Sequence, residues 1–238
     1  MLPDYDAAAG KVDGVMITAR HGDNHYKYAK PYLTSGIPMF IDKPITCTEE
    51  DAVAFMKEAH ANGVRLCGGS VLPTLPEVLE LRDSVADQRN GKVLGGHLAC
   101  PVQMSSVYGG FHFYSQHLVQ MMTTIFGEGV RSVCANRRET ALSFLARYDD
   151  YDVSGTFGDA IHYYNVSVYT TKSAWAVPCT LGSDSFAHEM DDMLALLHGE
   201  PMKTAYASFI RPVFVINALV RSADFGTWEP VRDSGLTF

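Results

Sequence analysis

Residues 12–44, VDGVMITARHGDNHYKYAKPYLTSGIPMFIDKP, decide the fold. Val12–Thr18 and Ile37–Ile41 are short apolar runs typical of buried strands, and Asp23–Ser35 between them has the apolar spacing of a helix. Gly36 follows this helix, and glycine is the usual residue where a helix ends in the left-handed conformation. A strand, a helix and a second strand in this order predict a right-handed parallel βαβ unit.

Polar residues follow both predicted strands. Because ligands of open α/β sheets bind beyond the carboxyl ends of the strands, these residues form a first candidate site: Thr18, Ala19, Arg20 and His21 after one strand, and Asp42, Lys43 and Pro44 after the other. Lys43, placed by the proline that follows it, is a positioned cation that can donate to a substrate hydroxyl or polarise a carbonyl. The alternative is a solvated lysine in a strand-to-helix loop.

The β-α-β pattern continues and then changes. Thr48 is a good N-cap for a helix that reaches about Asn62, and Val64–Cys67 is a third parallel strand. Further on, most predicted strands follow one another without helices, which indicates a largely antiparallel sheet: Val93–Val102, Val130–Ala135, Leu142–Tyr148, Tyr163–Thr170, Ala174–Cys179 and a short Thr227–Val231. Helices are predicted over Leu75–Val85, Phe113–Phe126, Phe186–Leu197 and Thr204–Ser222. We therefore predict an α/β fold with domains at 1–72 and 73–238.

The composition limits the possible functions. The chain has 238 residues, of which 47% are hydrophobic, so it can bury a substantial core. A net charge of −8 argues against a nucleic-acid binder. No apolar run is long enough to span a membrane. The five cysteines have no CxxC spacing, which favours reduced thiols in a cytoplasmic protein over a disulfide framework or a zinc site.

A second candidate site is Tyr108–His117, YGGFHFYSQH, directly before an almost uncharged helix. A histidine at the start of a buried helix can act as a general acid or base, because its pKa lies near neutral pH. The alternative is a glycine turn with a capping histidine. His112 and His117 are five residues apart, which is not the helical spacing of metal ligands, and the acidic Asp184–Asp192 is interpreted as a solvated helix start. We therefore predict no metal site.

These segments together resemble the glucose–fructose oxidoreductase, inositol dehydrogenase and MocA family. GIPMFIDKP is similar to the family signature G-K-x-V-x-x-E-K-P, with Asp42 in place of glutamate. VDGVMIT resembles the fourth strand of the family's Rossmann domain, and TEEDAVAFMKEAHANGVRLCGG resembles the helix and strand that follow its signature. GGFHFYSQHLVQMMTTIFG resembles the segment that opens the second domain, and Phe186–Ser222 its closing helices.

The resemblance implies a partial Rossmann domain followed by an α+β domain with a large open sheet, through which the chain would form a homo-oligomer. It implies hydride transfer between NAD or NADP and a secondary alcohol of a sugar- or cyclitol-like substrate. By the same resemblance, Lys43 orients the substrate and His117 is the catalytic histidine. The residues implied along the cofactor are Thr18, Ala19, Arg20, His25, Asp42, Lys43 and Pro44.

The sequence departs from the family in two ways. The family's aspartate, four residues before the histidine, corresponds to Phe113, so Tyr114 or His112 is the candidate replacement as proton donor. The fingerprint G-x-G-x-x-G is absent, and the first three Rossmann strands have no counterpart. We therefore expect Val12–Thr18 to be an exposed edge strand. Either the sequence is a fragment, or a second chain supplies the missing half, or the protein is a cofactor-free sugar-binding or assembly module.

Overall fold

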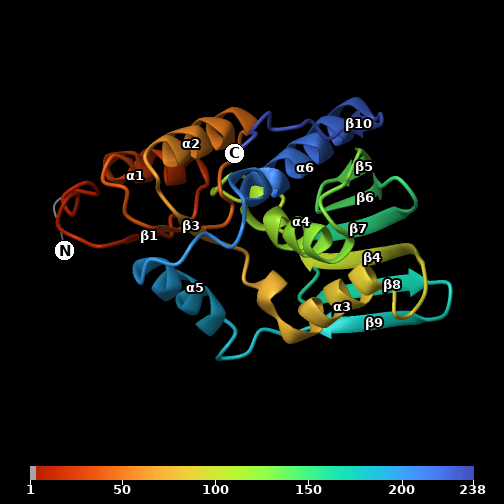
Figure 1. Cartoon of the computed structure of the whole chain (residues 1–238). Coiled ribbons are helices and arrows are strands. Elements are labelled where there is room, and N and C mark those ends of the chain that lie inside the picture. Colours follow the sequence, from red (N-terminus) through yellow and green to blue (C-terminus); the bar gives the residue numbers. More distant parts are fainter. Residues whose placement is uncertain (1–3) are drawn as a thin grey trace.

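The structure is a computed structural model that describes residues 4–238, and it contains two sheets (Figure 1). The smaller sheet consists of three parallel strands in the order β1-β2-β3. Its strands are β1 (Val15–Ile17), β2 (Met39–Asp42) and β3 (Leu66–Gly69), connected by α1 (Asp23–Leu33) and α2 (Glu49–Ala61). The βαβ unit predicted from residues 12–44 is therefore present, and Gly36 has the expected positive φ of 68°.

The larger sheet has seven strands in the order β10-β5-β6-β7-β4-β8-β9. Neighbours pair antiparallel except β4 and β7, which are parallel. The strands are β4 (Val93–Pro101), β5 (Ser132–Arg138), β6 (Ala141–Arg147), β7 (Asp152–Gly158), β8 (Tyr164–Thr170), β9 (Ala174–Cys179) and β10 (Glu229–Pro230). Together with the parallel sheet, this confirms the predicted fold class.

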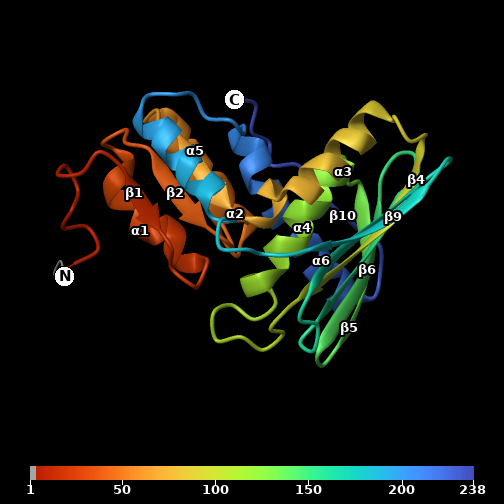
Figure 2. The ribbon, with the colours of Figure 1, turned by 90° about the horizontal axis from the view of Figure 1, so that it is seen from below.

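Helices cover one face of the large sheet (Figure 2). They are α3 (Pro76–Asp87), α4 (His112–Phe126) and α6 (Tyr206–Phe225), and a short 3-10 helix, η1 (Leu72–Thr74), precedes α3. The first half of α6, including Phe209 and Val213, packs into the core of the small sheet, and its second half, including Ile216 and Leu219, packs into the core of the large one. Helix α6 thereby joins the two cores.

Strand β7 is the one large-sheet strand that the sequence analysis did not predict. Its sequence, DVSGTFG, has two glycines and alternating polar residues, which weaken the strand signal. The sheet itself requires Gly155, because a Cβ there would lie 2.2 Å from Cε1 of Phe144 on the neighbouring strand. The Phe144 ring occupies the space that a side chain at position 155 would need. The requirement for glycine therefore comes from the neighbouring strand.

Strand β1 lies at the edge of the small sheet, as expected, and Met16 is 44% exposed. Helix α5 (Ala187–Leu197) packs close to the segment leading into β1, because a Cβ on Gly14 would lie 2.7 Å from Met193 Cε. Among the helices of residues 4–238, none is long and apolar enough to cross a membrane. The domain boundary at residue 72 stays a prediction.

A buried carboxylate ties α2 to α6 and to the C-terminal segment. Glu49 is only 7% exposed, and its two oxygens accept hydrogen bonds from Arg221 Nη1 at 2.7 Å and Arg232 Nη1 at 3.2 Å. A buried carboxylate is stable only with such partners, since its desolvation is costly. The two arginines therefore fix the small sheet against α6.

Glu49→Gln is expected to lower the free energy of unfolding by about 1–3 kcal/mol, because it leaves two arginines without their shared charge. Urea unfolding followed by circular dichroism would measure the change. The matched control is Glu50→Gln, since Glu50 is the exposed neighbour on the same turn. Equal effects of the two substitutions would contradict a structural role of the Glu49 cluster.

Candidate active site

Lys43 lies directly beyond the carboxyl end of β2 and points at the start of α4. Its Nζ is 4.4 Å from the ring centroid of Phe113 and 4.5 Å from that of Tyr114. Two aromatic faces at this distance attract a cation. Burial lowers the pKa of Lys43, while the neighbouring Asp42 raises it and Arg20 lowers it. Its one hydrogen bond within residues 4–238, to Phe113 O, is 3.5 Å long, so Nζ keeps donors for a ligand.

Helix α4 brings His117 to the same place. Residues three and four apart share a face of a helix, so His117 lies on the side of Phe113 and Tyr114. The ring centroids of Tyr114 and His117 are 5.3 Å apart, and the ring centroid of Tyr164 on β8 is 6.0 Å from that of His117. The structure therefore gathers Lys43, Tyr114 and His117, which the local residue patterns had placed in two candidate sites and the family resemblance in one.

His112 lies elsewhere, because five residues along a helix turn the side chain away from the face of His117. It lines a surface hollow together with Met104, Arg137 and Val220. Its Nε2 is buried and has no hydrogen-bond partner within residues 4–238. Burial lowers the pKa of His112 and so disfavours the charged form of the ring. The role of His112 as a proton donor stays a prediction, but it would need to act from a separate hollow.

His117 is buried at 7% exposure, and its Nδ1 lies 2.7 Å from Ser70 Oγ. Burial, followed by the charge of Lys43, lowers the pKa of His117 to about 3. The imidazole is therefore neutral at physiological pH. Ser70 immediately follows β3, so the ends of β2 and β3 both contribute to this site.

Sequence reasoning missed two glutamines on α4 that position these loops. Gln116 Oε1 accepts the backbone N–H of Ile45 at 2.9 Å, and Gln120 Oε1 accepts that of Ser70 at 2.9 Å. Gln116 Nε2 in turn donates to Gln120 Oε1 at 3.1 Å. Gly69 makes the approach possible, because its φ is 93° and a Cβ there would lie 2.8 Å from Gln120 Oε1. The sequence signal for these contacts was the i, i+4 spacing of the two glutamines, which places both on one face of the helix that carries His117.

The loop after β1 supplies the remaining predicted residues. Thr18 and Arg20 are exposed, and Arg20 stacks on the ring of Tyr108 with its Cζ 5.2 Å from the centroid. His25 is fully buried, with Nδ1 2.7 Å from Pro44 O and Nε2 2.6 Å from Ala19 O. Burial lowers its pKa, while the two carbonyls and Asp42 raise it. His25 thus connects the two loops and holds Ala19 and Pro44 in place.

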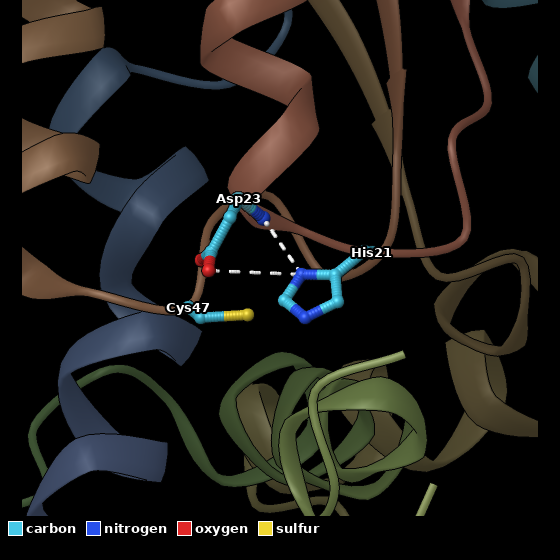
Figure 3. A group of neighbouring side chains, drawn as sticks. All are labelled: His21, Asp23 and Cys47. Atoms are coloured by element: carbon cyan, nitrogen blue, oxygen red, sulfur yellow. Dashed lines mark hydrogen bonds and ion pairs between the residues drawn. The ribbon is translucent and has the colours of Figure 1, made fainter. Parts of the chain in front are cut away.

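His21, Asp23 and Cys47 form a cluster at the start of α1 (Figure 3). Their potential ligand atoms lie within 4.8 Å of one another. However, Nδ1 of His21 already accepts the N–H of Asp23 at 3.3 Å, and a helix N-terminus favours anions. Burial and the charge of Asp23 raise the pKa of Cys47 to about 12, which keeps the thiol protonated. We interpret the cluster as a loop anchor, and the absence of a metal stays a prediction.

Residues 2–70 match the model of an oxidoreductase family with an NAD-binding Rossmann fold, GFO_IDH_MocA. The predicted family resemblance is confirmed. No curated protein sequence matches this chain at a significant level. The sequence resemblance to the second-domain segments, residues 73–238, lies outside the matched range.

Solved structures of similar fold cover nearly the whole chain. GenD2 from gentamicin A biosynthesis, in complex with NAD, is 17% identical with a TM-score of 0.85, over 96% of this chain and 82% of that one. A putative myo-inositol dehydrogenase from Sinorhizobium meliloti is 18% identical with a TM-score of 0.83, over 96% and 84%. Levoglucosan dehydrogenase, in complex with NADH and L-sorbose, is 13% identical with a TM-score of 0.84, over 99% and 84%. At these identities the likeness shows a shared fold.

The charge of Asp42 also reaches α5. Glu189 on that helix is 9% exposed, and burial, followed by the charges of Asp42 and Asp192, raises its pKa to about 7. The folded state therefore binds more protons than the unfolded state between about pH 4.5 and pH 7. The free energy of unfolding consequently falls as the pH rises through this range.

Glu189→Gln is expected to remove this decrease of the free energy of unfolding with rising pH. The variant and the parent should be nearly equally stable at pH 5, and the variant more stable by about 1–2 kcal/mol at pH 8. Urea unfolding at both pH values would measure the difference, with the exposed Glu200→Gln as the control. If the difference in free energy of unfolding between variant and parent does not grow with pH, the pKa of Glu189 is not raised in the folded state.

Proposed function

We propose that the chain is a nicotinamide-dependent oxidoreductase of this family type, acting on a secondary alcohol of a sugar- or cyclitol-like substrate. The observation that carries the proposal is the Lys43 ammonium group, held between two aromatic rings beside the neutral His117. A half-buried cation and an imidazole at the carboxyl rim of a parallel sheet suit an alcohol or carbonyl oxygen. The fold shared with GenD2 and with levoglucosan dehydrogenase supports it.

The residues at this rim fit the nicotinamide end of the cofactor. Lys43 has unused donors for a ribose or substrate hydroxyl, and His25 fixes the backbone on both sides of the rim. NAD or NADP, when bound, supplies or accepts the hydride. The residues that would hold it are Thr18, Ala19, Arg20, His25, Asp42, Lys43 and Pro44. Because the sequence contains no G-x-G-x-x-G, these residues would form the nicotinamide side of the pocket.

Each side chain has a separate task in this proposal. Lys43 orients the substrate oxygen through a charge-assisted hydrogen bond. In this proposal His117 is the catalytic histidine, and it contacts the same substrate oxygen as Lys43. The ring centroid of Tyr114 lies 4.5 Å from Lys43 Nζ and 5.3 Å from the ring centroid of His117, so Tyr114 is better placed than His112 to replace the family's aspartate.

We further propose that the chain assembles as a homo-oligomer through the large sheet. The helices cover one face of this sheet (Figure 2), and on β6 the buried Leu142, Phe144 and Ala146 alternate with more exposed residues. Tyr169 on β8 is 45% exposed. Such a face, apolar in places and free of helices, is suited to contact a second copy.

Calorimetric titration of the purified chain with NADH and with NADPH tests the cofactor part of the proposal. We expect micromolar binding of one or both, and Lys43→Ala should weaken it at least tenfold because a charge-assisted hydrogen bond is lost. Lys57→Ala on the exposed face of α2 is the control. Light scattering on the same sample would report the oligomeric state.

No binding by a folded sample would contradict an enzyme made of this chain alone. It would leave the cofactor-free sugar-binding or assembly protein as the better description.

Activity against a panel of sugars and cyclitols tests the catalytic part. His117→Ala is expected to lower kcat at least 100-fold, because one positioned hydrogen-bonding group at the reacting oxygen is removed. Tyr114→Phe and His112→Ala separate the two candidate replacements for the family's aspartate. If both variants keep full activity, neither residue is needed as a proton donor.

A further inference from the structure

Ser70 and His117 form a buried pair whose hydrogen atoms can be assigned from the surrounding donors. Ser70 is 3% exposed, and its Oγ lies 2.7 Å from His117 Nδ1. The backbone N–H of Leu72 donates to the same Oγ at 3.2 Å. An N–H can only donate, so one of the two lone pairs of Oγ is already in use.

Two arrangements of the remaining protons are possible, and only one satisfies both Ser70 Oγ and His117 Nδ1. If Nδ1 donated to Oγ, the serine hydroxyl hydrogen would need a further acceptor, and no other hydrogen-bond partner of Oγ exists within residues 4–238. A buried donor left without an acceptor is costly. If the hydroxyl donates to Nδ1, both groups are satisfied, and the proton of the neutral imidazole must reside on Nε2.

The charges around the ring agree with a neutral imidazole. Lys43 is the charged group that acts on His117, and it disfavours a second positive charge on the ring. At the position where the family has an aspartate, Phe113 supplies a ring that stacks on Lys43 instead of a carboxylate. His117 therefore has a serine, which donates, as its Nδ1 partner.

We propose that Ser70 is a positioning residue that holds His117 as the Nε2–H tautomer, so that His117 is a hydrogen-bond donor to the substrate oxygen and Lys43 is the group that transfers the proton. This deepens the proposed function and rests on it, with Lys43 in place of Tyr114 or His112 as the proton donor. A neutral imidazole with its only proton on Nε2 cannot accept a second proton there. Giving that proton away would leave an imidazolate, which is strongly disfavoured. The ring polarises the oxygen without exchanging its proton.

The reaction step then balances with Lys43 as the acid. During reduction a reduced nicotinamide, when bound, would supply the hydride to the carbonyl carbon, and the electron pair of the C=O π bond would move to the oxygen. That oxygen takes a proton from Lys43 Nζ, which becomes a neutral amine and is reprotonated by a proton from bulk solvent, so that the net reaction consumes one hydride and one solvent proton. Oxidation is the reverse, with the neutral amine of Lys43 as the base. Burial lowers the pKa of Lys43, which makes its ammonium group a stronger acid toward the substrate oxygen.

The tautomer can be read directly, without cofactor or substrate. Long-range proton–nitrogen NMR of the full chain with ¹⁵N-labelled histidine distinguishes protonated from unprotonated ring nitrogens, and His117→Gln identifies the signals of His117. We expect an unprotonated Nδ1 and a protonated Nε2. Ser70→Ala should give a mixture of tautomers, and Ser70→Thr should restore the single form. A protonated Nδ1 in the parent protein would overturn the proposal.

Steady-state kinetics test whether His117 acts only as a hydrogen-bond donor while Lys43 transfers the proton. His117→Gln keeps an N–H donor but cannot exchange a proton, so we expect kcat within about tenfold of the parent, against a loss of about 10²–10³ for His117→Ala. Lys43→Met should cost about 10²–10⁴ in kcat. Equal losses for His117→Gln and His117→Ala would overturn the proposal. If the parent chain shows no turnover at all, the proposed function fails, while the NMR result still decides the tautomer.

Discussion

The side-chain amides of Gln116 and Gln120 are the contacts on which the candidate site depends. Each accepts a backbone N–H from a loop at the carboxyl end of a small-sheet strand, Ile45 after β2 and Ser70 after β3. A buried N–H without an acceptor costs about 1–3 kcal/mol, so these loops are fixed to α4. Because His117 lies between the two glutamines, the same helix turn sets the distance from the imidazole to both loops.

The electrostatics of the site follow from this packing. His117 is enclosed by α4, Tyr164 of the large sheet and Ser70, and enclosure disfavours its charged form. Lys43 is half-buried and has two aromatic faces near its charge. The site therefore combines the Lys43 cation with the neutral imidazole of His117, and the residues around each side chain favour its protonation state.

The small sheet depends on the rest of the chain in a similar way. Three short parallel strands cannot cover their own apolar faces. Helix α6 supplies Phe209 and Val213 to that core, and the Glu49–Arg221–Arg232 cluster attaches the C-terminal segment to α2. The two halves of the chain are thus parts of one packed structure, although their sheets are separate.

The sequence by itself determined the βαβ unit, the cap at Thr48, most large-sheet strands and the family resemblance, because these depend on local spacing and on residues near one another in the chain. Local patterns also pointed to Lys43 and His117 as candidates at two places in the chain, and the family resemblance predicted that they share one site. Strand β7, the glutamine contacts and the Ser70–His117 pair were decided only by the tertiary structure. Gly155 requires a neighbouring phenylalanine, and Ser70 meets a histidine 47 residues away. Local patterns carry no information on such partners, and the partner sets both the tautomer and the pKa.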